Sequence, residues 1–134
     1  MNKILTRSME DYLEIIYIME QNNKVVGITD IANALSFSKA SVNRAINVLK
    51  SEDMVLQEKY KKISLTEKGR KIALEVYEKH KILSEFFIKI LKVSSKTAEI
   101  DACKAEHVLS IETLESIKNF LESRNKNRSN SIEK

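Results

Sequence analysis

Proline is absent from the sequence, and glycine occurs only twice in 134 residues. These two residues interrupt helices most strongly, so few positions oblige a helix to end. The single cysteine, Cys103, excludes an internal disulfide framework and is typical of proteins in a reducing compartment. We therefore expect a mainly helical, cytoplasmic protein.

Long hydrophobic runs are also missing. No segment approaches the roughly 18 consecutive apolar residues of a membrane span. Residues 1–7 lack the apolar stretch and the small-residue cleavage site of a secretory signal. Hydrophobic residues make up 43% and charged residues 31% of the chain, a balance that is typical of a folded globular protein. We expect no membrane partner.

The positive charge is concentrated in one part of the chain. Between Lys39 and Lys71 there are nine basic and four acidic residues. A basic block of this kind is the pattern expected of a protein that binds a polyanion such as nucleic acid. A solvated, lysine-rich surface would give the same composition, so composition alone does not decide between the two.

Apolar residues recur at helical spacing along most of the chain. The pattern predicts helices over residues 9–20, 30–35, 39–50, 67–91 and 96–108, and a last one from 111. Hydroxyl residues stand where caps are needed, namely Ser8, Thr29, Ser38, Thr66 and Ser110. Two short apolar runs between residues 54 and 65 flank a charged turn, which predicts a β-hairpin. The fold class is therefore mainly α with a small β-hairpin.

Two short helices, a tight break between them and a hairpin directly afterwards are the parts of a winged helix-turn-helix. The second helix has polar residues on the face that burial does not need, and asparagine and arginine there suit adenine and guanine. Lysines at the hairpin tip are placed to contact phosphates. A hairpin with only a structural role is the alternative. The candidate DNA-binding residues are Ser38, Lys39, Ser41, Asn43, Arg44, Lys59, Lys61 and Lys62.

Potential metal ligands share faces of the predicted helices. Two carboxylates lie three residues apart on the first helix, and a thiol, a carboxylate and an imidazole stand at i, i+3 and i+4 on the fifth. Mixed donors of this kind suit first-row divalent ions. Each residue alone has a simpler explanation, since acidic pairs are often solvated and a lone cysteine often packs in a core. The candidates are Asp11, Glu14, His80, Cys103, Glu106 and His107.

Several segments resemble the iron- and manganese-dependent repressors that are related to the diphtheria toxin repressor. Residues 8–17 (SMEDYLEIIY) resemble the opening helix of that family, and residues 101–110 (DACKAEHVLS) resemble its metal-binding helix. Three shorter segments look like its helix-turn-helix and wing boundaries: residues 30–32 (DIA), 41–42 (SV) and 65–69 (LTEKG). The resemblance covers about residues 8–121.

The resemblance implies a homodimer that represses transcription by binding operator DNA when Mn²⁺ or Fe²⁺ is bound, and that controls metal uptake. It implies that the six candidate ligands hold the metal. Residues 1–70 would form the winged helix-turn-helix domain, residues 71–123 a helical metal-binding and dimerisation domain, and residues 124–134 a disordered tail. The end of the chain after the last helix looks like the short manganese regulators of the family.

The sequence departs from both types of the family. Asp11 and Glu14 match the manganese type, whereas Cys103 matches the iron type and replaces a carboxylate of the manganese type. Ser84 and Glu99 stand where the iron type has a glutamate and a histidine, and Glu85 follows directly after Ser84. The sequence therefore leaves open which metal binds and which residues would form the second metal site of the iron type. Glu99 is a candidate outer ligand.

A metal that joins three helices would fix the distance between two recognition helices, which must be about one DNA turn, roughly 34–36 Å. Three other functions are compatible with parts of the sequence. A winged-helix regulator without metal control is one, and a helical protein-interaction module is another. A metal-dependent hydrolase using Glu106 and His107 is the third, but no HExxH motif, phosphate loop or nucleophile elbow accompanies them. We therefore expect that the protein is not an enzyme.

Overall fold

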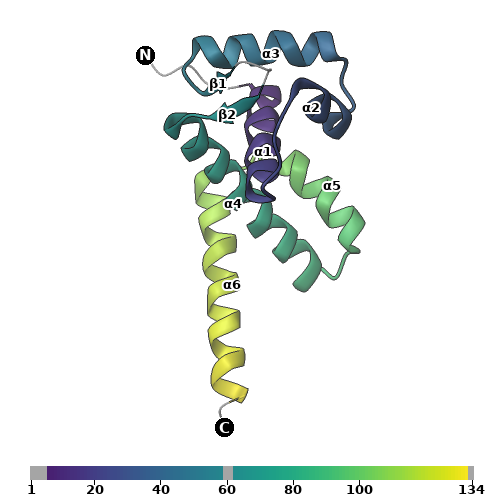
Figure 1. The fold of residues 1–134 in the computed structure, drawn as a ribbon. Coiled ribbons are helices and arrows are strands. Elements are labelled where there is room, and N and C mark those ends of the chain that lie inside the picture. The colour runs from purple at the N-terminus through teal and green to yellow at the C-terminus, as the bar shows by residue number, and fades with distance from the viewer. Residues whose placement is uncertain (1–5, 59–61, 133–134) are drawn as a thin grey trace. The chain divides into compact units, whose positions relative to one another are not determined.

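The computed structural model describes residues 6–58 and 62–132, with side chains described as far as residue 127 (Figure 1). The predicted class is confirmed, because this part of the chain consists of helices and one two-stranded sheet. The elements are α1 (Arg7–Gln21), α2 (Ile28–Leu35), α3 (Lys39–Ser51), β1 (Val55–Gln57), β2 (Ile63–Leu65), α4 (Glu67–Lys89), α5 (Ser95–Ala105) and α6 (Ile111–Ile132).

The chain divides into two compact units, and the boundary lies inside α4, between Val76 and Tyr77. The first unit holds α1, α2, α3, the hairpin and the start of α4, and the second holds the rest of α4 with α5 and α6. None of the helices in the described part of the chain combines the length and the hydropathy that crossing a bilayer requires.

Three of the predicted caps are confirmed. The hydroxyl of Ser38 accepts a hydrogen bond from the N–H of Ser41 at 3.1 Å, at the start of α3. Thr66 Oγ1 accepts from the N–H of Gly69 at 3.0 Å, and Ser110 Oγ accepts from the N–H three residues later at 3.1 Å. Each hydroxyl satisfies a backbone donor that has no partner within its helix.

The caps predicted for the first two helices are wrong. Thr6 caps α1 through a hydrogen bond of 3.2 Å from the N–H of Met9, so Ser8 lies within the helix. Gly27 takes the extended cap conformation before α2, and the carboxylate of Asp30 accepts from its N–H at 3.0 Å. The Asp30 side chain, in the first turn of α2, thus makes the capping hydrogen bond, and Thr29 lies within the helix.

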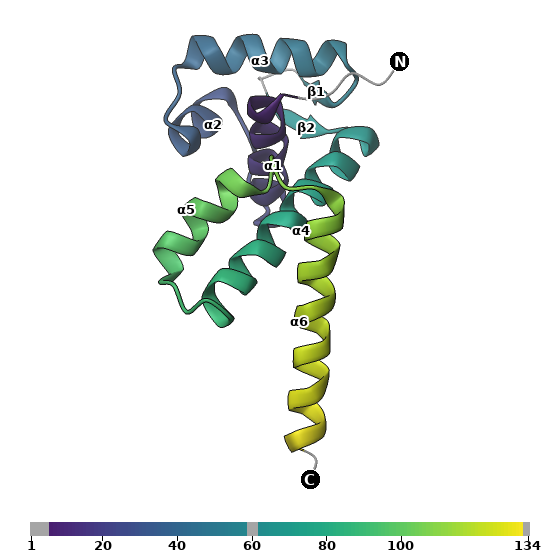
Figure 2. The same ribbon diagram turned by 180° about the vertical axis from the view of Figure 1, so that it is seen from behind.

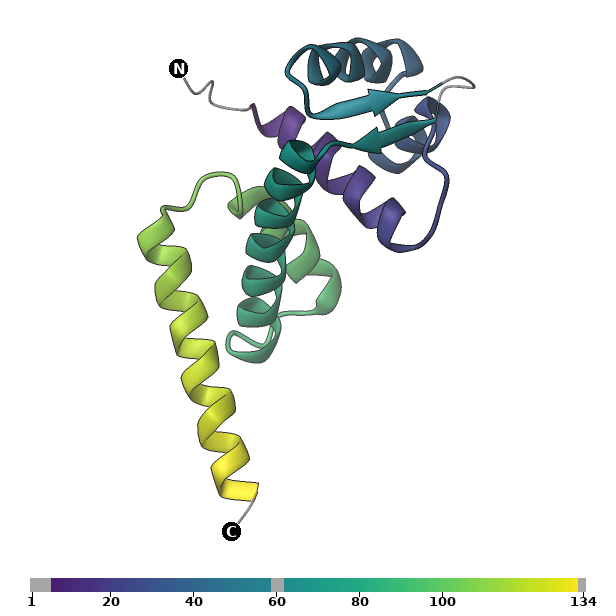
Figure 3. The same ribbon diagram turned by 60° about the vertical axis from the view of Figure 1, so that its left-hand side comes forward.

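The first unit packs its helices around the hairpin. β1 and β2 pair antiparallel in the register Val55↔Leu65, and Val26 forms a single bridge to Ile63. Figure 3 shows α3 on one side of the two strands and α1 on the other. The core contains apolar residues from all of these elements, including the fully buried Leu13, Ile16 and Ile46.

The junction between the hairpin and α4 is very tight. A Cβ atom added to Gly69 would lie 2.0 Å from the carbonyl oxygen of Met54, so only glycine fits there without movement of the backbone. The same carbonyl accepts a hydrogen bond from the N–H of Thr66 at 3.0 Å. The start of α4 is therefore fixed against the residue that leads into β1.

The second unit has its own small core. Leu83 of α4, Ala102 of α5 and Leu114 of α6 are buried together. Figure 2 shows the C-terminal part of α4 between α5 and α6. The core thus joins three helices that follow one another in the sequence.

Two helix ends of the second unit differ from those expected. α5 ends at Ala105 instead of Val108, since the backbone turns there and the N–H of Val108 bonds to the carbonyl of Ala105. α6 continues to Ile132, so the segment expected to be a tail from residue 124 is helical as far as that residue. Residues 111–132 include no glycine or proline to end the helix.

Candidate DNA-binding surface and metal centre

Helix α3 buries one face and leaves the other open. Val42, Ile46 and Leu49 are fully buried in the first unit. Lys39, Asn43 and Arg44, which the sequence singled out, are exposed, as is Ser38. Lys39 and Asn43 are four residues apart and so share one line of this face, and Arg44 follows directly after Asn43. This is the arrangement needed to read base edges in a major groove.

A short hydrogen-bonded chain runs along the start of α3. The hydroxyl of Ser38 donates to Ser41 Oγ at 2.9 Å, and a guanidinium nitrogen of Arg44 donates to the same oxygen at 3.4 Å. Ser41 is half-buried, whereas Arg44 is exposed. The two serines therefore act within the protein, as a cap and as an anchor for the arginine.

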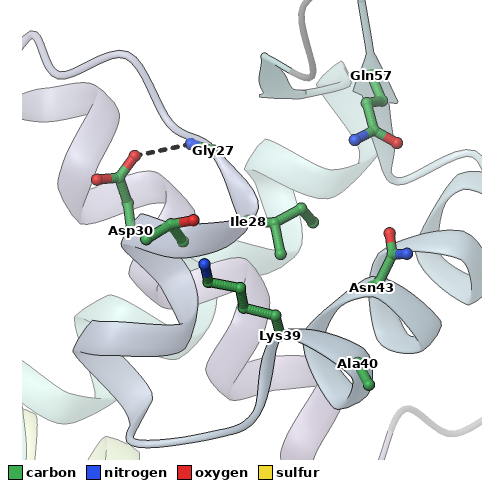
Figure 4. A pocket seen from close by; sticks show the side chains of 8 residues that line it. Gly27, Ile28, Asp30, Lys39, Ala40, Asn43 and Gln57 are labelled. Carbon is green, nitrogen blue, oxygen red and sulfur yellow. Dashed lines mark hydrogen bonds between the residues drawn. The ribbon is translucent and has the colours of Figure 1, made fainter.

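A groove of about 750 Å³ lies beside this face (Figure 4). In Figure 4 the amides of Asn43 and Gln57 face the same open space, and the side chain of Lys39 points towards α2. The sequence reasoning missed Gln57, which also accepts a hydrogen bond from Lys50 Nζ at 3.4 Å. Strand alternation gives no signal for it, because the pattern places Gln57 on the same strand face as the buried Val55. The groove is lined by Gly27, Ile28, Thr29, Asp30, Lys39, Ala40, Asn43 and Gln57.

The hairpin tip is described only in part. Lys62 directly precedes β2 and is exposed. Lys59 and Lys61, which were also expected to contact phosphates, lie outside the described residues. Of the three lysines, Lys62 is the one whose position supports a contact to the DNA backbone.

Two of the expected metal ligands belong to the first unit. Asp11 and Glu14 lie three residues apart on α1 and so share a helix face. Glu14 is 8% exposed and Asp11 is half-buried. Burial of a carboxylate is costly unless a cation or hydrogen-bond donors stabilise it, so Glu14 has the setting of a functional group.

The second unit brings the imidazole of His80 between two carboxylates. His80 Nδ1 lies 2.9 Å from Glu106 Oε2, and its Nε2 contacts a carboxylate oxygen of Glu99. The side chains are exposed to different degrees, 0% for Glu106, 16% for His80 and 63% for Glu99. One acid is therefore enclosed by protein, and the other faces water.

These contacts change the protonation of the imidazole. The hydrogen bond with Glu106 is the largest cause that raises the pKa of His80, which reaches about 9 from its usual 6.5. Desolvation opposes this rise, and the hydrogen bond with Glu99 adds to it. At neutral pH and without metal the ring is therefore a cation, and a bound metal would take the place of one of its protons.

Glu106 and its neighbours form a donor set at the end of α5. Its Oε1 lies 3.3 Å from His107 Nε2 but is buried without a hydrogen bond among the described residues. A carboxylate oxygen of Glu106 and Cys103 Sγ lie within 4.8 Å of each other. A buried carboxylate oxygen without a hydrogen bond, with imidazole and thiol groups nearby, fits a divalent metal ion.

Ser84, Glu85 and Glu99, the residues considered for a second metal site, differ in what they contact. Glu85 accepts a salt bridge of 3.0 Å from Lys89, one helical turn away on α4. Ser84 Oγ is buried and makes no hydrogen bond within the described residues. Among the described contacts of these three residues, only Glu99 therefore contacts a candidate ligand, namely His80.

Comparison with known proteins identifies the family. A family model described as the N-terminal DNA-binding domain of iron-dependent repressors matches residues 4–63, and one described as their metal-binding and dimerisation domain matches residues 66–131. The chain is 39% identical to an HTH-type transcriptional regulator of Methanocaldococcus jannaschii, over 88% of the chain and 95% of that protein. The chain belongs to the iron-dependent repressor family.

Two further relatives of this repressor are named as regulators, and one of them as a manganese regulator. It is 36% identical to the HTH-type transcriptional regulator MntR of Geobacillus kaustophilus, over 84% of the chain and 79% of MntR. It is 30% identical to the solved manganese regulator SloR, with a TM-score of 0.77, over 88% of the chain and 55% of SloR. The repressor thus spans about half the length of SloR.

The comparisons confirm the predicted resemblance and the predicted class. The repressor has a winged helix-turn-helix followed by a helical metal-binding and dimerisation domain, as its family does. Family members of this kind are metal-responsive transcriptional repressors, and the hydrolase reading gains no support from any of these matches.

Proposed function

We propose that the repressor binds operator DNA as a homodimer when Mn²⁺ or Fe²⁺ is bound, and that it controls uptake of that metal. The observation that carries the proposal is the buried carboxylate of Glu106, which is flanked by two imidazoles in a chain that also has a winged helix-turn-helix. It is not an enzyme, and since its partner is DNA we assign it to the cytoplasm.

The proposed ligands come from α1, α4 and the end of α5. His80, Cys103, Glu106 and His107 belong to the second unit, and Asp11 and Glu14 to the first. A bound ion supplies positive charge and directional bonds, which favour the arrangement in which these carboxylates come together. The ligands of the first unit link the ion to the helix that packs beside the DNA-reading elements.

Metal control then follows from a shift of populations. A homodimer presents two recognition helices, which bind successive major grooves only when their separation fits roughly 34–36 Å. A ligand that favours this arrangement strengthens DNA binding by its coupling free energy, typically about 1–3 kcal/mol, or 5–150-fold. The same coupling makes bound operator DNA strengthen metal binding.

The donor set narrows the choice of metal. Carboxylate oxygens suit Mn²⁺, and a thiolate from Cys103 shifts the preference towards Fe²⁺ and the later first-row ions. The solved relative SloR is named as a manganese regulator. We therefore propose Mn²⁺ or Fe²⁺ as the co-repressor, with imidazole ligation compatible with both.

On the DNA side, we assign base contacts to the exposed face of α3 and phosphate contacts to the hairpin. Asn43 and Arg44 present hydrogen-bonding groups to the major groove. Lys62, together with Lys59 and Lys61, contacts the backbone and positions the dimer without reading sequence. Ser38 and Ser41 hold the start of α3 and the side chain of Arg44.

The test is a titration of DNA binding with and without metal. An operator is first selected from a random duplex library in the presence of Mn²⁺, and affinity is then measured by fluorescence anisotropy with Mn²⁺, with anaerobic Fe²⁺ and with a chelator. We expect chelation to weaken binding by roughly 5–150-fold. Equal affinity after chelation would contradict metal control.

A matched pair of variants locates the effect. Glu106→Gln keeps the size of the buried side chain and removes its charge, so metal should no longer strengthen DNA binding. Glu115→Gln makes the same change at an exposed position of α6 and should respond to metal as the unmodified repressor does. Light scattering on the metal-loaded protein tests the homodimer.

A further inference from the structure

His80 is unusual because each of its two ring nitrogens meets a different carboxylate. Glu106 faces Nδ1 and Glu99 faces Nε2. Glu99, Cys103 and Glu106 stand at i, i+4 and i+7, so they lie on one stripe of the α5 segment. That stripe faces α4 at His80, and the two helices also pack through Leu83 and Ala102.

An imidazole cannot bind a metal through both nitrogens of one neutral ring. A neutral ring has one lone pair and one N–H, so a metal at one nitrogen leaves the other as a donor. In protein metal sites that N–H is almost always donated to a carboxylate, a carbonyl or water. The two carboxylates at His80 must therefore have different roles.

Burial decides which carboxylate has which role. Glu106 is fully buried, and its Oε1 makes no hydrogen bond among the described residues, so it has an oxygen available for an ion. Glu99 is 63% exposed, and water can stabilise its charge. The Nδ1 side is thus the metal side, and the Nε2 side is the outer side.

We propose that Glu99 is a positioning residue of the metal site: it accepts the hydrogen bond from His80 Nε2–H and so directs the Nδ1 lone pair towards the ion. This inference rests on the proposed function, since it assumes that His80 and Glu106 hold a metal. Glu99 fixes both the tautomer and the orientation of the ring, and it makes the imidazole a stronger donor. An exposed glutamate of α5 thereby strengthens the binding of an ion that it does not contact.

Metal titrations of three variants test the proposal. Glu99→Ala removes the acceptor, Glu99→Gln keeps an acceptor oxygen without the charge, and Asp101→Ala removes an exposed acid from the same helix. Loss of such an outer partner weakens metal affinity by roughly 10–100-fold. We expect that loss in Glu99→Ala at unchanged metal stoichiometry, a smaller loss in Glu99→Gln, and none in Asp101→Ala. Calorimetry with Mn²⁺ measures affinity and stoichiometry.

The position of the proton gives a second readout, which a merely structural role would not change. In ¹⁵N-labelled protein loaded with diamagnetic Zn²⁺, the ring proton of His80 should be bonded to Nε2, and Glu99→Ala should broaden or remove its signal. The protein contains two histidines, and a His80→Gln sample assigns the signals.

Three results would overturn the proposal. The proton could be found on Nδ1, Glu99→Ala could bind one ion fewer at unchanged affinity, or affinity could stay the same in all variants. The second result would make Glu99 a ligand of a separate ion. If the unmodified repressor binds neither Mn²⁺ nor Zn²⁺, the proposed function fails as well, so the two failures are distinguishable.

Discussion

Replacement of Gly69 by alanine should destabilise the repressor, although the same change inside a helix usually stabilises it by about 1 kcal/mol. The new Cβ would lie 2.0 Å from Met54 O, whereas real Cβ atoms keep about 3.0 Å or more. The backbones must therefore separate by at least 1.0 Å, the difference between these two distances. The atom in the way is main chain, so no side chain can rotate to relieve the contact.

The cost has two parts. Overpacking of this kind typically costs about 1–3 kcal/mol. Movement of Met54 O also strains the hydrogen bond that it accepts from Thr66, and a lost buried bond costs about 1–3 kcal/mol. After subtraction of the gain in helix propensity, we expect a net loss of about 1–3 kcal/mol. With a urea slope of about 2 kcal/mol/M, the unfolding midpoint falls by about 1 M.

The assay is urea unfolding followed by circular dichroism, in chelator so that metal binding does not mask the change. Gly27→Ala is the matched control, since a Cβ there would meet only Asp30 Oδ2, at an ordinary 3.5 Å. That change should cost about 0.5–1 kcal/mol, because glycine is a better N-cap than alanine. If Gly69→Ala unfolds at the same or a higher urea concentration, the close approach is not as described.

Three further predictions concern pH, DNA and the second core. Because the pKa of His80 is raised from 6.5 to about 9, its contribution to stability in metal-free protein is complete below pH 6.5 and is lost as pH rises through about 9. The melting temperature should fall over that range more steeply than in His80→Gln, and parallel curves would refute the assignment. Arg44→Ala should cost about 1–3 kcal/mol of operator affinity and relax one base position, whereas Lys62→Ala should lower the salt slope by about 1; unchanged anisotropy curves would exclude these contacts. Leu83→Ala should cost about 2–5 kcal/mol in urea unfolding, since Leu83 is fully buried, and a loss below about 1 kcal/mol would exclude it from the core.

Local chemistry explains which parts of the fold the sequence predicted correctly. Ser38 caps α3 as expected, because a serine that precedes a helical repeat has few competing roles. Thr29 was a plausible cap for α2, but Asp30 bonds the N–H of Gly27 and moves the start of the helix back. Cap preferences compete within a few residues, and the sequence does not show which hydroxyl or carboxylate wins.

In the candidate metal site, too, the sequence predicted the local arrangement but not the packing between helices. Helical spacing placed Cys103, Glu106 and His107 on one segment, and the structure keeps them together at the end of α5. That α5 packs against α4 with Glu99 and Glu106 on either side of His80 is a tertiary fact. No local pattern contains it, because Glu99 and Glu106 follow His80 by 19 and 26 residues and reach it only when the two helices pack together.

The hydrogen bond between Arg44 and Ser41 bears on the entropic cost of the proposed operator binding. A free arginine side chain has about 2 kcal/mol of rotamer entropy, which it loses when it forms hydrogen bonds with a base. Arg44 is already restrained by the hydroxyl of Ser41 before any DNA is present. In the proposed complex, part of that loss has already occurred in the folded protein, so the contact with Ser41 lowers the entropic cost of a base contact by Arg44.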